Sequence, residues 1–268
     1  AGTRRCGSEG CNLIVTDPRN RDNDYRDEQN YVGGPEPREI AFVSPRPEDI
    51  RPMMTAWLAM VGRLAESEMD AVVAAAAASF SFVFLHPFLD GNGRIHRFLI
   101  HYLLARKRFT PPGGLVPVSA TMLARMKEYD AALDRYSVPL MARVRYDLDS
   151  EFRVEVLHDS SGYYRYPDLT AQAEALYGWV AAAIDEDVPK ELVFMLAYRD
   201  ARRRVLEIVE LPDQKAEHFV LGCIQQGGRL SNNLRRHKNF ANLSAAEANK
   251  MEAAVRAAMV EHGMSVAD

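Results

Sequence analysis

The longest apolar stretch of the chain, Ala71–Leu85, constrains the fold more than any other feature. Alanine, valine and phenylalanine fill most of its positions, so a helix formed here is apolar on nearly every face. The stretch is shorter than the roughly 20 residues that a membrane-spanning helix needs, and Ser79 and Ser81 interrupt it. We therefore expect a helix over Glu68–Leu85 that lies at the centre of a helical bundle.

An amphipathic helix and a hairpin are predicted ahead of this central helix. From Pro47 to Leu64, apolar side chains recur every three or four residues, which is typical of a helix with one buried face. Two short β-type runs come before it, Gln29–Val32 and Glu39–Val43, and the glycines and prolines between them favour a hairpin with a long loop. Residues 1–24 are polar and irregular, so we interpret them as an N-terminal arm.

The central helix should end at Leu85 or His86, because Pro87 disfavours helical geometry in the residue before it. A short loop containing two glycines follows. A further helix is expected to begin near Gly93 and to end before the Pro- and Gly-rich residues that start at Thr110.

The remaining chain is also predicted to be mostly helical. A helix is expected over Ser119–Val138, with Pro139 interrupting it, and a hairpin is expected between Phe152–Leu157 and Tyr163–Tyr166. We place the domain junction near this hairpin, after residue 143. Beyond it the periodicity predicts four helices, over Leu169–Ile184, Lys190–Val209, Ala216–Gln226 and Ala245–Val260.

The composition is that of an ordinary globular protein. Of 268 residues, 47% are hydrophobic and 26% are charged, which excludes a disordered or fibrous chain. The net charge of −4 argues against a dedicated DNA-coating protein. Three cysteines, Cys6, Cys11 and Cys223, are too few for a disulfide framework, and their odd number suits a reducing compartment. With no signal peptide pattern at the start, we expect a cytoplasmic protein.

One segment after the central helix concentrates residues suited to chemistry, and it reads His86-Pro-Phe88-Leu-Asp90-Gly91-Asn92-Gly93-Arg94-Ile-His-Arg97. Gly91-Asn92-Gly93 opens the expected helix, so free backbone N–H groups point out of its N-terminus, where the macrodipole is positive. The two glycines have no Cβ, which lets the backbone approach an anion closely. The segment therefore predicts a backbone cradle for an anion.

Four side chains flank this predicted cradle. Arg94 and Arg97 lie three residues apart, so they share a helix face and suit phosphate oxygens. Asp90 offers a carboxylate for Mg²⁺ shared with phosphates, and His86 can act as a general base near neutral pH. Each feature alone is also typical of a turn between packed helices or of a solvated helix face. Their combination predicts a site for phosphoryl or nucleotidyl transfer.

The ordered string H-x-F-x-D-G-N-G-R-x-x-R resembles the defining motif of the Fic family, H-x-F-x-[DE]-G-N-G-R-x-x-R, at every fixed position. The resemblance covers residues 25–143 and implies a mainly α fold, a Fic-type helical bundle with a short β-hairpin flap. A smaller, mostly helical domain of unknown role follows over residues 144–268. Members of the family commonly transfer AMP from ATP, with Mg²⁺, to a hydroxyl group of a target protein. The resemblance therefore implies a protein adenylyltransferase acting on a Tyr, Thr or Ser side chain.

The resemblance also implies a role for each motif residue. His86 would deprotonate the target hydroxyl, Phe88 would anchor the loop, and Asp90 would bind Mg²⁺. The phosphates of ATP would contact Gly91, Asn92, Gly93, Arg94 and Arg97. The flap would hold the target segment as an added strand through Gln29, Asn30, Tyr31 and Val32. Glycine at position 93, where phosphate-transferring Doc-type relatives have lysine, favours adenylylation.

Several alternatives remain open from the sequence. A Fic fold could run another transfer, such as phosphocholine transfer or AMP removal. Residues 218–246 hold several basic and no acidic side chains, which leaves a nucleic-acid-binding or regulatory role for the C-terminal domain, although a solvated basic face is favoured. Neither Ser8-Glu9-Gly10 nor Ala1-Gly2-Thr3 matches the inhibitory motif of many Fic proteins, so autoinhibition stays open. No membrane partner is expected, and a homodimer is left open.

Overall fold

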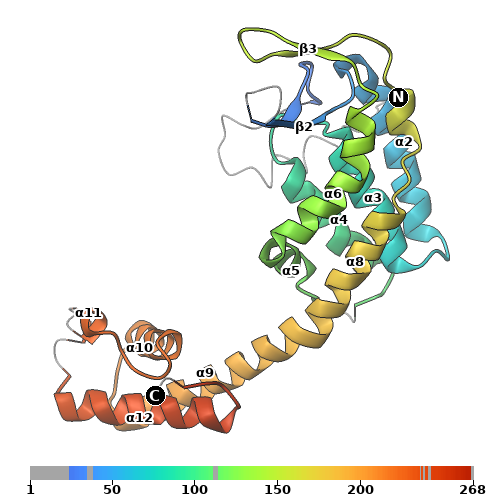
Figure 1. Cartoon of the computed structure of the whole chain (residues 1–268). Helices are drawn as coiled ribbons and strands as arrows, with labels where there is room; N and C mark the ends of the chain where they lie inside the picture. Colours follow the sequence, from blue (N-terminus) through green and yellow to red (C-terminus); the bar gives the residue numbers. More distant parts are fainter. Residues whose placement is uncertain are drawn as a thin grey trace. The chain divides into compact units, whose positions relative to one another are not determined.

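The computed structural model describes residues 24–34, 39–110, 114–235, 237, 239–240 and 243–266. The chain divides into two compact units, Ala1–Ala183 and Ile184–Asp268 (Figure 1). The predicted arm over residues 1–24 lies outside the described residues, except for Asp24. Most of the described residues are helical, and the strands form two small antiparallel sheets, so the mainly α fold class is confirmed.

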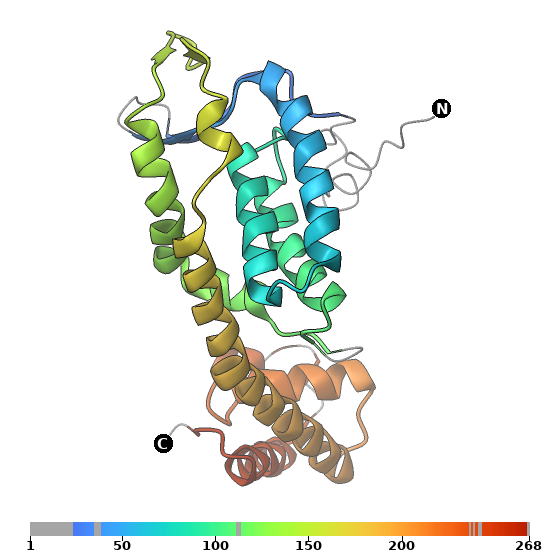
Figure 2. The ribbon, with the colours of Figure 1, turned by 90° about the vertical axis from the view of Figure 1, so that its right-hand side faces the viewer.

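The helix α3 (Ala71–Leu85) is the centre of the first unit. It packs against α2 (Pro47–Glu66), α4 (Asn92–Arg106) and α8 (Thr170–Ala182) (Figures 1 and 2). The helix begins at Ala71 rather than at the expected Glu68 because Asp70 caps it: the Asp70 Oδ1 atom accepts the N–H groups of Val72 at 2.8 Å and Val73 at 3.1 Å. The expected central helix is therefore confirmed.

A flap hairpin lies on the first unit, as the sequence predicted. Its strands β1 (Tyr31–Gly33) and β2 (Ile40–Val43) are antiparallel, with Tyr31 facing Val43. Gly33 has a φ of +135°, and a Cβ there would lie 2.0 Å from the Glu39 carbonyl oxygen, so this position requires glycine. The strand β1 begins at Tyr31 and not at Gln29, whose side chain bonds across to Ser44.

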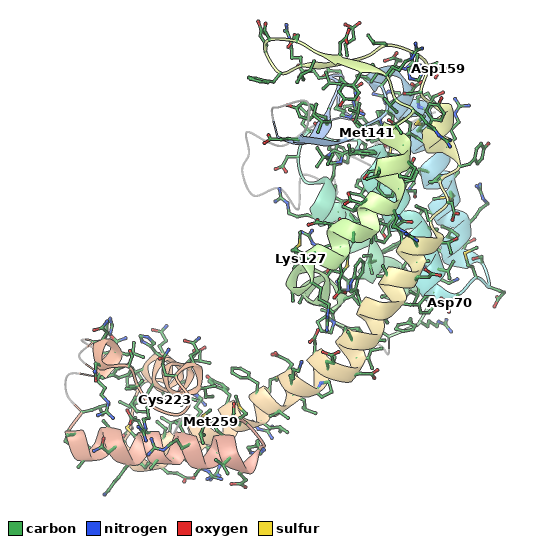
Figure 3. All side chains as sticks on the ribbon, viewed as in Figure 1. Asp70, Lys127, Met141, Asp159, Cys223 and Met259 are labelled. Carbon is green, nitrogen blue, oxygen red and sulfur yellow. The ribbon has the colours of Figure 1, made fainter. Side chains whose placement is uncertain are left out.

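The helix after α5 (Val118–Ala124) runs further than expected. The sequence predicted one helix over Ser119–Val138 that Pro139 interrupts. The structure has two helices here, α5 and α6 (Met126–Met141), and α6 continues through this proline. Tertiary contacts hold the last turn in place, since Leu140 is buried and the Met141 sulfur accepts the Val43 N–H at 3.2 Å. Met141 lies beside β2 in Figure 3. Packing against the flap thus outweighs the hydrogen bond that a proline removes.

The second hairpin lies earlier in the chain than expected. Its strands are β3 (Tyr146–Leu148) and β4 (Val154–Val156), and the predicted strand Tyr163–Tyr166 forms instead a helical turn, α7 (Gly162–Arg165). Two aspartates cause the difference. The Asp149 carboxylate accepts the N–H groups of Glu151 and Arg153, which makes the turn between β3 and β4. The Asp159 carboxylate accepts the N–H group of Ser161, which makes a second turn just ahead of α7.

The first unit extends beyond the expected domain junction at residue 143. Tyr164, Leu176 and Trp179 are buried in the same core as α3, and the Tyr164 hydroxyl donates to the Val43 carbonyl oxygen at 2.7 Å. The boundary between the two units therefore lies between Ala183 and Ile184.

The second unit is helical throughout its described elements. Inside it, α9 (Val188–Ile208) packs against α10 (Asp213–Gln225) and α12 (Ala245–Glu261), and a core that includes Phe219 and Met251 lies between them. A π-helical turn, η3 (Ala183–Asp187), precedes α9, and the sequence did not predict the short helix α11 (Asn232–Arg235). None of the described helices combines the length and apolar character that crossing a bilayer demands.

Candidate active site

The motif segment forms the connection between α3 and α4. His86 directly follows α3 and adopts a left-handed conformation, with φ 48° and ψ 56°. This conformation is costly for a residue with a Cβ, so surrounding contacts must hold it. The His86 N–H donates to the Phe82 carbonyl oxygen at 3.0 Å, and its own carbonyl oxygen accepts the Arg26 Nε–H at 2.9 Å.

The imidazole of His86 is arranged to accept a proton. Its Nδ1 atom lies 3.3 Å from the Val83 carbonyl oxygen, and a carbonyl can only accept, so Nδ1 carries the proton. The lone pair is therefore on Nε2. Burial lowers the pKa of His86 to about 4, and the positive charge of Arg26 acts in the same direction. The ring is consequently neutral at pH 7, as a general base requires.

Phe88 and Asn92 fix the shape of the loop. The Phe88 side chain is only 2% exposed, and its ring centroid lies 5.7 Å from that of Tyr25 and 6.3 Å from that of Phe82. The buried Asn92 side chain bonds both backbone groups of Phe88: Oδ1 accepts its N–H at 3.1 Å and Nδ2 donates to its carbonyl oxygen at 2.6 Å. The Asn92 amide thus closes the loop, and we expect its backbone N–H at the start of α4 to contact an anion.

The two glycines open the N-terminus of α4. Gly91 has a φ of +86° and precedes the first helical residue. Gly93 lies inside the helix, and a Cβ added there would have the Arg97 Nη1 atom, 3.5 Å away, as its nearest neighbour, which is ordinary contact. The fold therefore has no steric need for glycine at 93. The first N–H groups of a helix have no helical carbonyl to bond, so the open side of Gly93 suits an anion.

The charged residues of the motif lie around this helix start. Asp90 Oδ2 and Arg94 Nη2 form an ion pair at 3.0 Å, while Asp90 Oδ1 accepts the Gly91 N–H at 2.6 Å. The Asp90 side chain is 53% exposed. The structure thus brings together His86, Asp90, Gly91, Gly93 and Arg97 along one loop and one helix turn.

Asp90 fits a magnesium ion only in company with a nucleotide. Among the described residues, no three His, Cys, Asp or Glu side chains cluster closely enough to hold a metal ion by themselves. Magnesium, however, is commonly held by one or two carboxylates together with substrate phosphates and water. A single exposed carboxylate next to the N-terminus of α4, where a phosphate could bind, fits that requirement.

Arg26 belongs to the site, although the sequence analysis did not single it out. This side chain is buried, with 4% exposure, and its guanidinium donates to three backbone carbonyl oxygens: His86 at 2.9 Å, Glu28 at 2.7 Å, and Pro45. Its backbone N–H also donates to the Pro87 carbonyl oxygen at 2.9 Å. No local pattern reveals this role, because His86 lies 60 positions away in the chain.

The four flap residues divide into two kinds. Val32 is 43% exposed on β1, whose only strand partner in the described sheets is β2. Gln29 instead faces inward to the hairpin, where its Nε2 atom donates to the Ser44 carbonyl oxygen at 2.8 Å. The Asn30 carbonyl oxygen accepts the Ser44 hydroxyl at 2.6 Å. Gln29 and Asn30 thus hold the hairpin together, and the open edge is that of Tyr31 and Val32.

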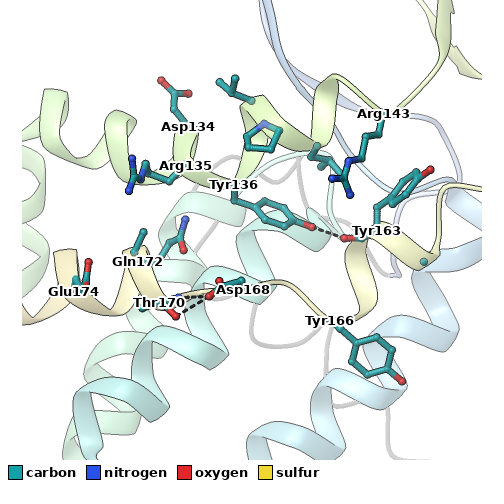
Figure 4. Close-up of a pocket in the computed structure, with 15 residues that line it drawn as sticks. Asp134, Arg135, Tyr136, Arg143, Tyr163, Tyr166, Asp168, Thr170, Gln172 and Glu174 are labelled. Atoms are coloured by element: carbon teal, nitrogen blue, oxygen red, sulfur yellow. Dashed lines mark hydrogen bonds between the residues drawn. The ribbon is translucent and has the colours of Figure 1, made fainter.

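His96, within the motif, is a core residue. It is fully buried, its ring centroid lies 4.8 Å from that of Phe80, and its Nδ1 atom lies 2.8 Å from the Ser79 carbonyl oxygen. Burial lowers the pKa of His96 to about 4. A separate groove of about 1010 Å³ runs beside the end of α6 and the start of α8, with Tyr136 and Tyr163 in its lining, and no motif residue lines it (Figure 4).

Comparison with known proteins finds a family that matches one segment of the chain. Residues 13–104 match the model of the Fic/DOC family. This segment of the chain is therefore of the Fic/DOC type. The Fic segment is 36% identical over 88 residues to a protein adenylyltransferase Fic of Drosophila ananassae and 35% identical to that of Drosophila willistoni. Each match covers 33% of this chain but 16% of the relative, so the shared part is a small share of those longer proteins.

Solved Fic structures are also similar to this chain. A Fic family protein from Desulfovibrio desulfuricans G20 is 18% identical, with a TM-score of 0.43, over 95% of this chain and 58% of that one. A Fic domain containing signaling protein from Bacteroides thetaiotaomicron is 20% identical, with a TM-score of 0.37, over 65% of this chain and 60% of that one.

Proposed function

We propose that this Fic protein is an adenylyltransferase that transfers AMP from ATP to a hydroxyl group of a protein target. The observation that carries the proposal is the His86 imidazole. The ring is neutral at pH 7 because burial lowers its pKa, and its Nδ1–H donates to the Val83 carbonyl oxygen, which leaves the lone pair on Nε2. His86 lies in the loop that leads directly to Gly91 and Gly93 at the start of α4. A proton acceptor and an anion cradle in one segment suit attack by a hydroxyl on a phosphate.

The proposed reaction balances with groups of this chain. The target hydroxyl oxygen forms a bond to the α-phosphorus while its proton passes to His86 Nε2, and the bond between the α-phosphorus and the bridging oxygen breaks, releasing pyrophosphate. The backbone N–H groups at the start of α4 and the Arg97 guanidinium stabilise the charge on the phosphates. Asp90 would hold Mg²⁺, which supplies charge neutralisation on the phosphate oxygens when bound.

The proposed protein substrate follows from the flap. In the described sheets β1 pairs with β2 alone, so its other edge could bind an extended segment by main-chain hydrogen bonds with little dependence on the sequence of that segment. A Tyr, Thr or Ser side chain of that segment would receive the AMP.

A variant of the proton acceptor tests the proposal. His86→Ala should lower transfer of the α-phosphate label of ATP to protein by about 10²- to 10⁴-fold, the usual contribution of a general base. ATP affinity measured by calorimetry should stay within about twofold, because the imidazole is not part of the cradle. A variant that keeps more than half of the wild-type transfer rate would contradict the mechanism. Transfer of the γ-phosphate label in place of the α-phosphate label would show that the Fic site runs another reaction.

The structure supports nucleic-acid binding by the basic segment, residues 218–246, less well than it supports the proposed transfer. Arg235 forms an ion pair at 2.5 Å with Glu252, which is buried, and the other oxygen of Glu252 accepts the Leu230 N–H at 3.0 Å. This arginine therefore serves the core of the second unit. Arg236 and Lys238 lie outside the described residues.

A further inference from the structure

The Arg26 side chain is a buried cation, and its hydrogen-bond partners among the described residues are all backbone oxygens. Burial lowers its pKa to about 10, which still leaves it charged at pH 7. Its three acceptors are the carbonyl oxygens of His86, Glu28 and Pro45, which belong to the motif loop, the start of the flap and the chain just before α2. A guanidinium is suited to this task, because its donors point in fixed directions within one plane.

One of these acceptors lies at a helix end. The His86 carbonyl follows the last residue of α3, where the helix macrodipole is negative and where a cation is stabilised. The last turn of α3, which is fully described, contains no basic residue of its own. Arg26 supplies this charge from a distant part of the chain.

The contact acts on the conformation of His86. A left-handed backbone conformation at a residue with a Cβ persists only where neighbouring contacts fix it. The His86 N–H is bonded to Phe82, and the carbonyl on its other side is bonded to Arg26. Without Arg26 the backbone of His86 can relax toward an extended conformation, which moves the imidazole away from Val83.

We propose that Arg26 is a positioning residue, which fixes the proton acceptor and the target-holding flap relative to each other through the carbonyl oxygens of His86, Glu28 and Pro45. The proposal rests on the proposed function, since it gives His86 and the flap their roles. It differs from a merely structural role in one respect: loss of Arg26 should lower the rate of transfer far more than it lowers nucleotide affinity. Within the described part of the chain, Arg26 makes no hydrogen bond to the anion cradle at the start of α4.

The test compares Arg26→Ala and Arg26→Lys with Arg51→Ala in the full chain. Arg51 is a matched control, because it is nearby, is 67% exposed, and pairs with Asp24 at 2.5 Å on the surface. We expect Arg26→Ala to lower the rate of α-phosphate transfer by about 10- to 100-fold, as a displacement near 1 Å in a reacting group does. ATP affinity should change by less than about twofold. Arg51→Ala should match the wild type in both measurements.

Two further measurements separate positioning from folding. Guanidinium at millimolar concentration should restore part of the rate of Arg26→Ala, whereas urea at the same concentration should not. Lysine at position 26 keeps the charge but not the planar fork of donors, so Arg26→Lys should also lower the rate of α-phosphate transfer. If the alanine variant does not fold, the rate of Arg26→Lys tests the positioning role. Equal losses of rate and of ATP affinity, or a wild-type rate in either folded variant, would overturn the proposal.

A readout that needs no activity keeps the two proposals distinguishable. ¹⁵N NMR of the imidazole in the wild type should show His86 as the Nδ1–H tautomer, and in the folded Arg26 variants this single tautomer should be lost while Arg51→Ala retains it. Unchanged imidazole signals in the Arg26 variants would overturn the positioning role. If the wild type transfers no label to any protein, the proposed function fails, but this tautomer measurement still decides the role of Arg26.

Discussion

Replacing Gly93 by alanine should stabilise the first unit and weaken nucleotide binding. Gly93 lies within α4, where glycine is less favourable than alanine by about 0.5–1 kcal/mol. The new Cβ would lie 3.5 Å from the Arg97 Nη1 atom, an ordinary contact that adds no strain. For a unit of this size, that gain corresponds to a rise of about 1–4 °C in melting temperature. The same Cβ would lie in the first turn of α4, where we expect a phosphate to approach the helix N-terminus.

We expect ATP affinity to fall at least tenfold, which is about 1.4 kcal/mol, because the Cβ separates the phosphate oxygens from the backbone N–H groups. Thermal melting without nucleotide and calorimetric titration with ATP give the two quantities. Gly62→Ala in α2 and Gly178→Ala in α8 are matched controls, since a Cβ at either position meets nothing within 4 Å. Both controls should melt at or above the wild-type temperature and bind ATP as the wild type does.

Two results would refute this reasoning. Wild-type ATP affinity in Gly93→Ala would mean that the nucleotide does not approach the helix at this position. A fall in the melting temperature of Gly93→Ala would mean that the fold requires glycine at 93, although a Cβ there has its nearest neighbour at an ordinary 3.5 Å.

Three further predictions follow from the site. Asp90→Ala should abolish the gain in ATP affinity that Mg²⁺ gives and leave metal-free binding within about twofold; equal losses with and without Mg²⁺ in calorimetry would mean that Asp90 serves only the loop. Replacing Gln29–Val32 with a Gly-Ser linker should remove protein labelling and leave ATP affinity unchanged; labelling that survives the replacement would exclude the flap as the target-binding strand. Lowering the pH from 6.5 to about 4 should lower the melting temperature, because burial lowers the pKa of His86 and His96 to about 4 and the unfolded chain binds more protons in this range. His86→Ala should show a shallower decline, and a flat wild-type profile would contradict both pKa shifts.

The sequence alone determined the features that depend on local periodicity and local chemistry. The mostly apolar composition of Ala71–Leu85 predicted a central helix, since a helix that is apolar on nearly every face buries its side chains only when neighbours pack around it. The glycines and prolines around residues 33–37 predicted the flap, and Pro87 predicted where α3 ends; the next helix was expected to begin near Gly93 and begins at Asn92. The motif residues were found because they lie within one short segment of the chain.

Only the tertiary structure decided the features that depend on contacts between distant residues. Pro139 stays inside α6 because Met141 contacts the flap, and no local rule contains that contact. The first unit reaches Ala183 because Trp179 is buried in the same core as α3. The role of Arg26 was equally hidden. Its guanidinium bonds carbonyl oxygens, which every residue type has, and so its partners are selected by the folded geometry and leave no pattern in the sequence.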